Sequence, residues 1–191
     1  MRAADNPFRV QRLVRLSYRL EEPTWEALLA RFASLGRRAA LVGPEGHGKS
    51  TLLGELGARL ARQGFELRAI TLRRGERRLA RPARERLLAG LGPRHVLLVD
   101  GAQELAAWQW GRLRRASRAA GGLLVTSHRP GLLPTLHECC TSPALLAELI
   151  AELAVATAAP LPPAAELFAR HDGNLRAALL DAYDRYAERL P

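Results

Sequence analysis

Residues Gly43-Pro44-Glu45-Gly46-His47-Gly48-Lys49-Ser50 are the most informative segment of this chain. They fit the pattern G-x-x-x-x-G-K-[ST], in which backbone N–H groups surround phosphate oxygens and the lysine reaches the outer phosphates. Lys49 is the only lysine among the 29 basic residues, and all the others are arginines. A tight loop needs a compact ammonium at this position, because the planar guanidinium of arginine is a poor replacement. The solitary lysine therefore indicates a phosphate-binding loop (P-loop).

The residues on either side of the P-loop alternate between strand-like and helix-like patterns. Residues 39–42 are a short apolar run that predicts a buried strand, and residues 49–63 carry a helical stripe of leucines. Further strands are expected at 65–72, 95–100, 123–127 and, as a short fifth strand, 136–140. Further helices are expected at 25–35, 76–89, 103–120, 144–157, 164–171 and 174–190. This alternation predicts an α/β fold: a parallel sheet between two helical layers (three-layer αβα).

The domain organisation follows from where the alternation stops. After residue 142 only helical patterns occur, and prolines at 160, 162 and 163 predict a break among them. The sequence therefore predicts a lead-in and helix over 1–35, a nucleotide-binding core over 36–142 and a small helical lid over 143–191. The lead-in at 6–20 is basic with scattered apolar positions, and its pattern fits neither a helix nor a strand alone.

Two sets of residues are candidates for binding a nucleoside triphosphate with Mg²⁺. The P-loop provides the first set, because its N–H groups and the start of the next helix favour phosphate. Lys49 is expected to contact the β- and γ-phosphates and the Ser50 hydroxyl to ligate Mg²⁺. Asp100 ends the strand at 95–100 and is expected to hold Mg²⁺ from the opposite side. The expected nucleotide-binding residues are Gly43, Pro44, Glu45, Gly46, His47, Gly48, Lys49, Ser50 and Thr51.

With these residues, the chain resembles the P-loop NTPases of the AAA+ type over roughly residues 36–190. Asn6-Pro7-Phe8 before the first helix is similar to the start of one subgroup. Thr126 ends the fourth expected strand, where the resemblance implies a polar "sensor 1" that reads the γ-phosphate. The segment Gly173-Asn174-Leu175-Arg176 is similar to the family's lid turn, which implies that Arg176 is "sensor 2".

Two departures from the AAA+ pattern concern hydrolysis. The family usually carries a water-positioning glutamate directly after the Walker B aspartate, but Gly101 stands there. Gln103 or Glu104 could replace it, as a water-orienting glutamine does in some GTPases, or both could simply begin a helix. The segment in which the family carries its arginine finger is very short here, and Arg129 is the nearest candidate. Other candidates, which could instead line a solvated helix face, are Arg112, Arg114 and Arg115.

These features favour an ATP-binding NTPase that is a slow ATPase or a nucleotide-dependent switch, with Lys49, Asp100, Glu104, Thr126 and Arg176 as candidate catalytic residues. ATP is favoured over GTP because the guanine-reading N-K-x-D motif requires a second lysine. One alternative is a P-loop small-molecule kinase, although the second strand ends in Thr71-Leu72-Arg73-Arg74 without the acid that such enzymes need. A homo-oligomer or a protein partner would be needed to supply an arginine finger in trans.

A second alternative is a nucleotide-dependent module that binds nucleic acid with little turnover. The net charge is +10, and arginines cluster at 73, 74, 77, 78, 81, 84 and 86. Such a cluster could bind phosphates or an acidic partner, or it could be a solvated helix face. No aromatic residue interleaves it in sequence, so the sequence gives no support for stacking on bases.

The remaining composition bears on the cellular setting. The cysteines are the adjacent pair Cys139 and Cys140, whose geometry disfavours a disulfide, so a reducing cytoplasm is expected. Residues 1–10 lack the apolar region of a signal peptide. No run approaches the roughly 18 apolar residues that a membrane helix needs, so no membrane partner is expected.

Overall fold

The structure is a computed structural model that describes residues 17–20, 22–154 and 162–188. The elements follow the order α2 (Trp25–Ser34), β1 (Arg38–Val42), α3 (Lys49–Arg62), β2 (Glu66–Thr71), α4 (Arg81–Leu88), β3 (His95–Asp100), α5 (Ala107–Ala116), β4 (Gly122–Ser127), β5 (Thr135–Glu138), α6 (Pro143–Ala154), α7 (Ala164–Arg170) and α8 (Leu175–Glu188). The Asn6-Pro7-Phe8 segment and Pro160 lie outside the described residues.

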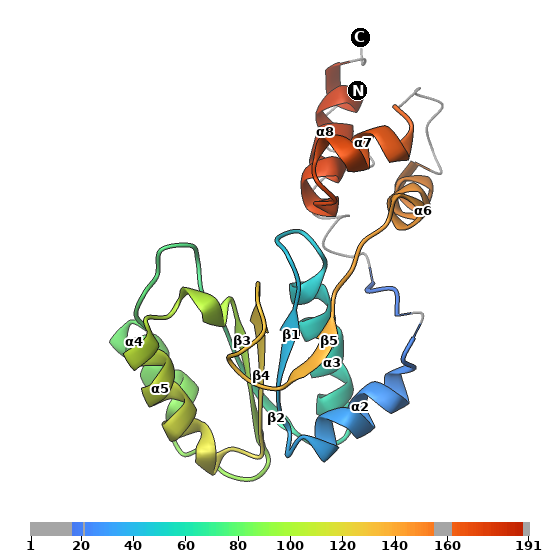
Figure 1. The fold of residues 1–191 in the computed structure, drawn as a ribbon. Helices are drawn as coiled ribbons and strands as arrows, with labels where there is room; N and C mark the ends of the chain where they lie inside the picture. The colour runs from blue at the N-terminus through green and yellow to red at the C-terminus, as the bar shows by residue number, and fades with distance from the viewer. Residues whose placement is uncertain (1–16, 21, 155–161, 189–191) are drawn as a thin grey trace. The chain divides into compact units, whose positions relative to one another are not determined.

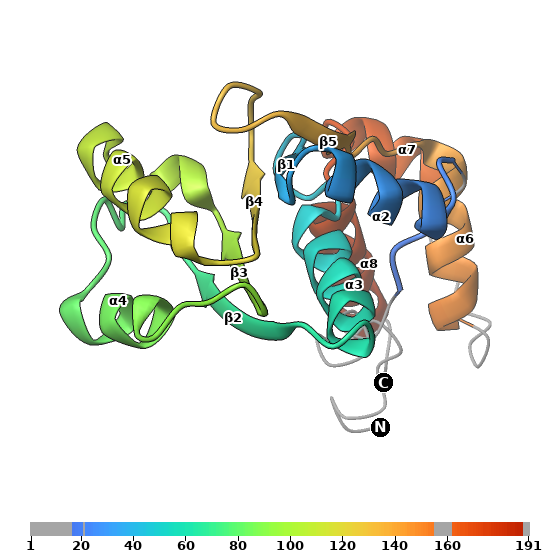
Figure 2. The ribbon, with the colours of Figure 1, turned by 90° about the horizontal axis from the view of Figure 1, so that it is seen from below.

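The five strands form one sheet in the order β2-β3-β4-β1-β5, and every neighbouring pair is parallel (Figure 1). Helices α4 and α5 cover one face of this sheet, and α3 and α2 lie on the other (Figures 1 and 2). This arrangement confirms the predicted α/β fold with a parallel sheet. Parallel strands need crossover connections, and helices between the strands provide most of them.

Alternate residues of the central strands face the two helical layers. Val42, Val99 and Val125 belong to one core cluster with Leu87 of α4 and Trp110 of α5. On the opposite face a Cβ on Gly57 of α3 would lie 2.7 Å from Leu98 Cδ1, so this glycine lets the helix approach the sheet closely. The central strands are buried on both faces, which explains why their sequences are continuous apolar runs.

The chain divides into two compact units. The sheet unit comprises Tyr18–Gly43 and Leu52–Glu138. The helical unit comprises the described parts of three segments, which are Met1–Ser17, Pro44–Thr51 and Cys139–Pro191. The P-loop therefore clusters with α6, α7 and α8. These three helices have their own core, built on Leu146, Leu149, Leu153, Leu167, Leu175, Ala178, Leu179, Ala182 and Tyr186.

Two predicted helices are wrong in extent. The helix expected at 76–89 begins only at Arg81, because Pro82 suits a first helical turn but not a helix interior. The helix expected at 103–120 is broken into a short 3-10 turn at Ala102–Glu104, α5, and a second 3-10 turn at Ser117–Ala119. Leu105 is buried in an extended conformation between the first two pieces. Burial of this leucine outweighs the local helical tendency.

None of the helices among residues 17–20, 22–154 and 162–188 has the length and apolarity needed to cross a membrane.

We expect the free energy of unfolding to decrease as the pH falls below about 6.5, in part because of His137 in β5. Burial lowers the pKa of His137, the Arg31 charge lowers it further, and Glu138 acts in the opposite direction. The unfolded chain then binds the proton more readily than the folded chain, so acid favours unfolding. Urea titrations between about pH 5 and 7 should show a weaker pH dependence for His137→Gln than for the wild type. An identical dependence in the two proteins would contradict this.

Candidate functional site

The P-loop connects the carboxyl end of β1 to the amino end of α3. Gly43 follows β1, and its N–H donates to the carbonyl of Ser127 at 3.2 Å, which ties the end of β1 to the end of β4. Gly46 and Gly48 have φ angles of +79° and +77°. These left-handed conformations favour glycine and turn the backbone sharply before the helix begins at Lys49.

The side chains at the start of α3 have the chemistry to hold a polyphosphate. Lys49 is a buried residue, with 8% of its surface exposed, and its Nζ donates to the carbonyl of Pro44 at 2.5 Å. Ser50 and Thr51 follow it and are exposed. The first turn of α3 contains no acidic residue, so nothing there opposes an anion at the helix start. A buried ammonium, a hydroxyl and a helix amino end together fit phosphate groups.

Asn174 lies directly against the P-loop within the helical unit. A Cβ placed on Gly46 would lie only 1.9 Å from Asn174 Oδ1, so this close approach requires glycine at position 46. The same Oδ1 accepts a hydrogen bond from Ala177 N at 3.0 Å and caps the first turn of α8. The Gly-Asn-x-Arg segment was identified in the sequence as a lid turn, but its contact with Gly46 was not predicted.

His47 connects the P-loop to the segment before α6. Its Nδ1 lies 3.1 Å from the carbonyl oxygen of Cys139, and its Nε2 lies 3.5 Å from Thr141 Oγ1. Thr141 Oγ1 in turn donates to the carbonyl of Gly173 at 2.8 Å. Thr141 could not be identified from the sequence, because a lone threonine in a loop has no characteristic pattern.

Asp100 and Thr126 come together at the ends of β3 and β4. Thr126 Oγ1 donates to Asp100 Oδ1 at 2.6 Å and accepts a hydrogen bond from Gly101 N at 2.7 Å. Only 1% of Thr126 is exposed. The carboxyl ends of β1 and β3 lie at the same edge of the sheet, with β4 between them. Gly43, which follows β1, and Asp100, which ends β3, therefore lie toward the same edge of the sheet.

We expect Thr126→Val to lower the free energy of unfolding by about 1–3 kcal/mol, because it leaves the buried Gly101 N–H without an acceptor. Thr126→Ser retains the hydroxyl and serves as the matched control. Thermal melts of both variants and the wild type would measure the effect. A valine variant that melts with the wild type would contradict this account of the Thr126 hydroxyl.

The two candidates for positioning water lie in the 3-10 turn that follows Gly101. Glu104 Oε2 accepts from Gly75 N at 3.0 Å, and its Oε1 accepts from Gln103 Nε2 at 3.2 Å. Glu104 therefore holds the loop at Gly75. Gln103 Oε1 is buried and has no hydrogen-bond partner among the described residues.

The candidate arginines lie in exposed positions. Arg176 is exposed in the first turn of α8. Arg129 is exposed in the segment after β4, where Ser127 Oγ donates to the Arg129 carbonyl at 2.8 Å. Residues 17–20, 22–154 and 162–188 contain no group of three or more His, Cys, Asp or Glu side chains arranged to hold a metal ion.

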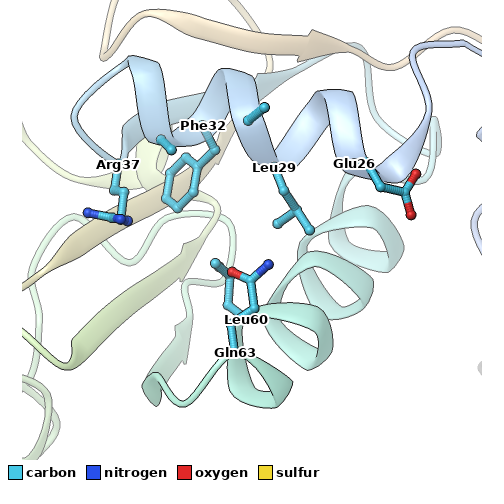
Figure 3. A pocket seen from close by; sticks show the side chains of 8 residues that line it. Glu26, Leu29, Phe32, Arg37, Leu60 and Gln63 are labelled. Atoms are coloured by element: carbon cyan, nitrogen blue, oxygen red, sulfur yellow. The ribbon is translucent and has the colours of Figure 1, made fainter.

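Figure 3 shows a pocket in the sheet unit between α2 and the end of α3. Leu29 and Phe32 of α2 face Leu60 and Gln63 across it, and Arg37 closes one side. Helix α3 begins at the P-loop and is about 21 Å long for its 14 residues. This pocket therefore lies toward the opposite edge of the sheet from the strand ends that carry the candidate residues.

Comparison with solved structures shows the fold. No protein-family model matches this sequence, and neither does any curated protein. The chain is similar to the RuvB Holliday junction branch migration motor of Thermotoga maritima, with a TM-score of 0.59 and 18% identity over 92% of this chain. It is also similar to NtrX from Brucella abortus in complex with ATP, with a TM-score of 0.53 and 13% identity over 91% of this chain.

The match covers 63% of that RuvB chain and 51% of the NtrX chain, so this chain spans part of the length of each. Sequence identities this low show a shared architecture, but they do not show a shared activity. The chain has the parallel-sheet α/β fold of the RuvB core, with a helical segment after it.

Proposed function

We propose that this chain binds ATP with Mg²⁺ and works as a slow ATPase or a nucleotide-dependent switch of the AAA+ type. The observation that carries the proposal is the buried Lys49 at the start of α3, directly after a loop with left-handed glycines. An ammonium at the amino end of a helix whose first turn has no acidic residue favours an anion at that place. The fold similarity to NtrX in complex with ATP agrees with this.

Each candidate residue has a role in this proposal. Lys49 neutralises the outer phosphates, and the P-loop backbone orients the phosphate chain. Ser50 and Asp100 would hold Mg²⁺, which prefers oxygen ligands and neutralises charge on the phosphates when bound. Thr126 fixes the orientation of the Asp100 carboxylate through their 2.6 Å hydrogen bond. Arg176 would reach the nucleotide from the helical segment over 143–191, which acts as a lid.

The contacts within the helical unit suggest how the lid would respond to nucleotide. Gly46 abuts Asn174, and His47 is linked through Thr141 to the carbonyl of Gly173. Any shift of the P-loop backbone on binding phosphates therefore acts on the turn that precedes Arg176. This coupling favours a switch even where turnover is slow.

The proposal is tested by measuring binding and turnover separately. Titration with a fluorescent ATP analogue, with and without Mg²⁺, should give saturable binding that ATP and ADP compete away. Phosphate release measured on the same preparation distinguishes an ATPase from a switch. Absence of saturable binding would reject the nucleotide site. Size exclusion with ATP and with ADP would show whether an oligomer forms, as an arginine finger from Arg129 requires.

We expect Glu104→Gln to retain at least about half of any turnover if Gln103 positions the water. The Glu104 carboxylate is engaged with Gly75 N, whereas Gln103 Oε1 is a buried acceptor without a described partner. An acceptor of this kind can orient water, as a glutamine does in some GTPases. Gln103→Ala would then lose most of the turnover. The reverse result, with Glu104→Gln inactive and Gln103→Ala active, would assign the role to Glu104.

A further inference from the structure

Nearly all of the net charge of this protein comes from two segments of the sheet unit. Segment 73–88 contains seven arginines and two glutamates, and segment 107–119 contains four arginines and no acidic residue. Together they carry a formal charge of +9 out of the net +10. The rest of the chain is almost neutral. The positive charge is therefore concentrated rather than spread along the sequence, and we call these two segments the arginine surface.

The fold brings the two segments of the arginine surface together. Helices α4 and α5 lie side by side on one face of the sheet (Figures 1 and 2). Ala106 N, just before α5, donates to the carbonyl of Arg77 at 3.0 Å. Leu79 and Leu87 from the first segment share a core cluster with Leu113 of the second. The exposed arginines of the surface are Arg73, Arg74, Arg77, Arg78, Arg81, Arg86, Arg112, Arg114, Arg115 and Arg118.

An exposed tryptophan lies within the arginine surface. Trp108 is 50% exposed, and in the described part of the chain only Leu180 is another exposed large hydrophobic side chain. The Arg78 guanidinium lies 5.3 Å from the centre of the Trp108 ring. Arg112 and Arg115 follow Trp108 at helical spacings of four and seven residues, so the three side chains share one face of α5. Segment 73–88 contains no aromatic residue, but Trp108 of the neighbouring helix α5 lies beside it.

The carboxylates near these arginines pair with only one of the guanidinium groups in the described ranges. Glu76 accepts a hydrogen bond from Arg73 N, and Glu104 accepts one from Gly75 N, so both hold backbone groups. Of the eleven arginines, only Arg81 forms an ion pair within the described ranges, with Glu85 at 2.8 Å. An exposed pair of this kind contributes little. The remaining guanidinium groups are available to an external anion.

We propose that the arginine surface binds single-stranded nucleic acid, with Trp108 stacking on a base and Arg112 and Arg115 contacting backbone phosphates. Exposed aromatic rings beside a positive surface are the elements that bind single strands without sequence preference. An unstacked base can lie on the indole, whereas the bases of a duplex are already stacked and paired. Planar arginines suit phosphate oxygens because they donate two hydrogen bonds in parallel. This site does not depend on the nucleotide site proposed above.

The test is fluorescence anisotropy with labelled oligothymidylate, oligouridylate and a DNA duplex of equal length, over a range of salt concentrations. Trp108→Ala should weaken single-strand binding by about 5- to 100-fold, and Trp108→Phe should retain most of it. The Arg112→Ala/Arg115→Ala variant should reduce the salt slope by about 1.4, since each single-strand phosphate contact contributes about 0.7. Arg62→Ala/Arg94→Ala removes two exposed arginines elsewhere and should leave the slope unchanged.

Each outcome of this experiment bears on the proposal. A preference between the thymidylate and uridylate strands identifies DNA or RNA as the ligand, and equal binding indicates that the sugar is not read. The proposal is overturned if Trp108→Ala binds like the wild type, if the duplex binds more tightly than either single strand, or if polyglutamate competes as well as the oligonucleotides. Since Trp108 is exposed, a melt equal to that of the wild type would exclude misfolding as the cause of lost binding.

Discussion

Lys49→Ala is expected to weaken ATP binding by about 10- to 100-fold and to reduce any turnover to background. A hydrogen bond to a charged group contributes about 1.5–3 kcal/mol, which corresponds to this range of affinity. Lys49 is buried at the start of α3, so water would not readily replace its charge. Isothermal titration with ATP and Mg²⁺ measures the loss directly.

Two further variants show what the lysine contributes. Lys49→Arg retains the charge and should still bind poorly, because the guanidinium does not fit a tight loop. Arg62→Ala removes a positive charge from the other end of the same helix and should bind ATP like the wild type. If Lys49→Ala binds ATP with unchanged affinity, the phosphate-binding assignment of this loop is wrong. If Lys49→Arg restores binding fully, charge alone explains why the position is basic.

Gly101→Glu, which introduces the glutamate common in AAA+ enzymes, is expected to lower the free energy of unfolding by about 2–3 kcal/mol without raising turnover. Gly101 has a φ of +80°, and side chains with a Cβ are strained there by about 1–3 kcal/mol. A Cβ at this position would also lie 2.8 Å from the carbonyl oxygen of Leu72, which is backbone and cannot rotate away. The loss should appear as a melting temperature lower by about 4–12 °C.

The contributions to this loss can be separated. Gly101→Ala should be destabilised about as much as Gly101→Glu, because the Cβ and not the carboxylate causes the strain. Gly36→Ala measures the cost of the left-handed backbone conformation alone. Gly36 has a φ of +64°, but a Cβ there would have nothing within 4 Å. A Gly101→Glu protein that melts like the wild type and hydrolyses ATP faster would show that the position tolerates the family's glutamate.

The sequence predicted the sheet well because its central strands, β1, β3 and β4, are buried on both faces. Continuous apolar runs such as 96–99 admit few other interpretations when helical patterns alternate with them along the chain. The helices at 76–89 and 103–120 were less well predicted, since their extents depend on tertiary contacts. Leu105 is drawn into the core, and Ala106 N bonds to the carbonyl of Arg77, which no local pattern encodes.

The same distinction applies to the candidate residues. Lys49 and Asp100 were identified because strand, loop and helix patterns surround them in sequence. The hydrogen bond from Thr126 to Asp100 and the approach of Asn174 to Gly46 join residues that are distant along the chain. Trp108 is half exposed, and Arg78, which lies thirty residues earlier in the chain, sits over its ring. Such pairings arise from the fold and leave no signal in a single sequence.

The hydrogen bonds of Thr126 have a consequence for nucleotide sensing. A threonine hydroxyl has a single proton, and Thr126 commits it to Asp100 while Gly101 N occupies one of its lone pairs. It cannot also donate to a phosphate oxygen. If Thr126 donates a hydrogen bond to the γ-phosphate, it must first break its hydrogen bond to Asp100. Both oxygens of the Asp100 carboxylate would then be available to a cation. Sensing the nucleotide and adjusting the metal ligand would be one exchange of partners rather than two separate events.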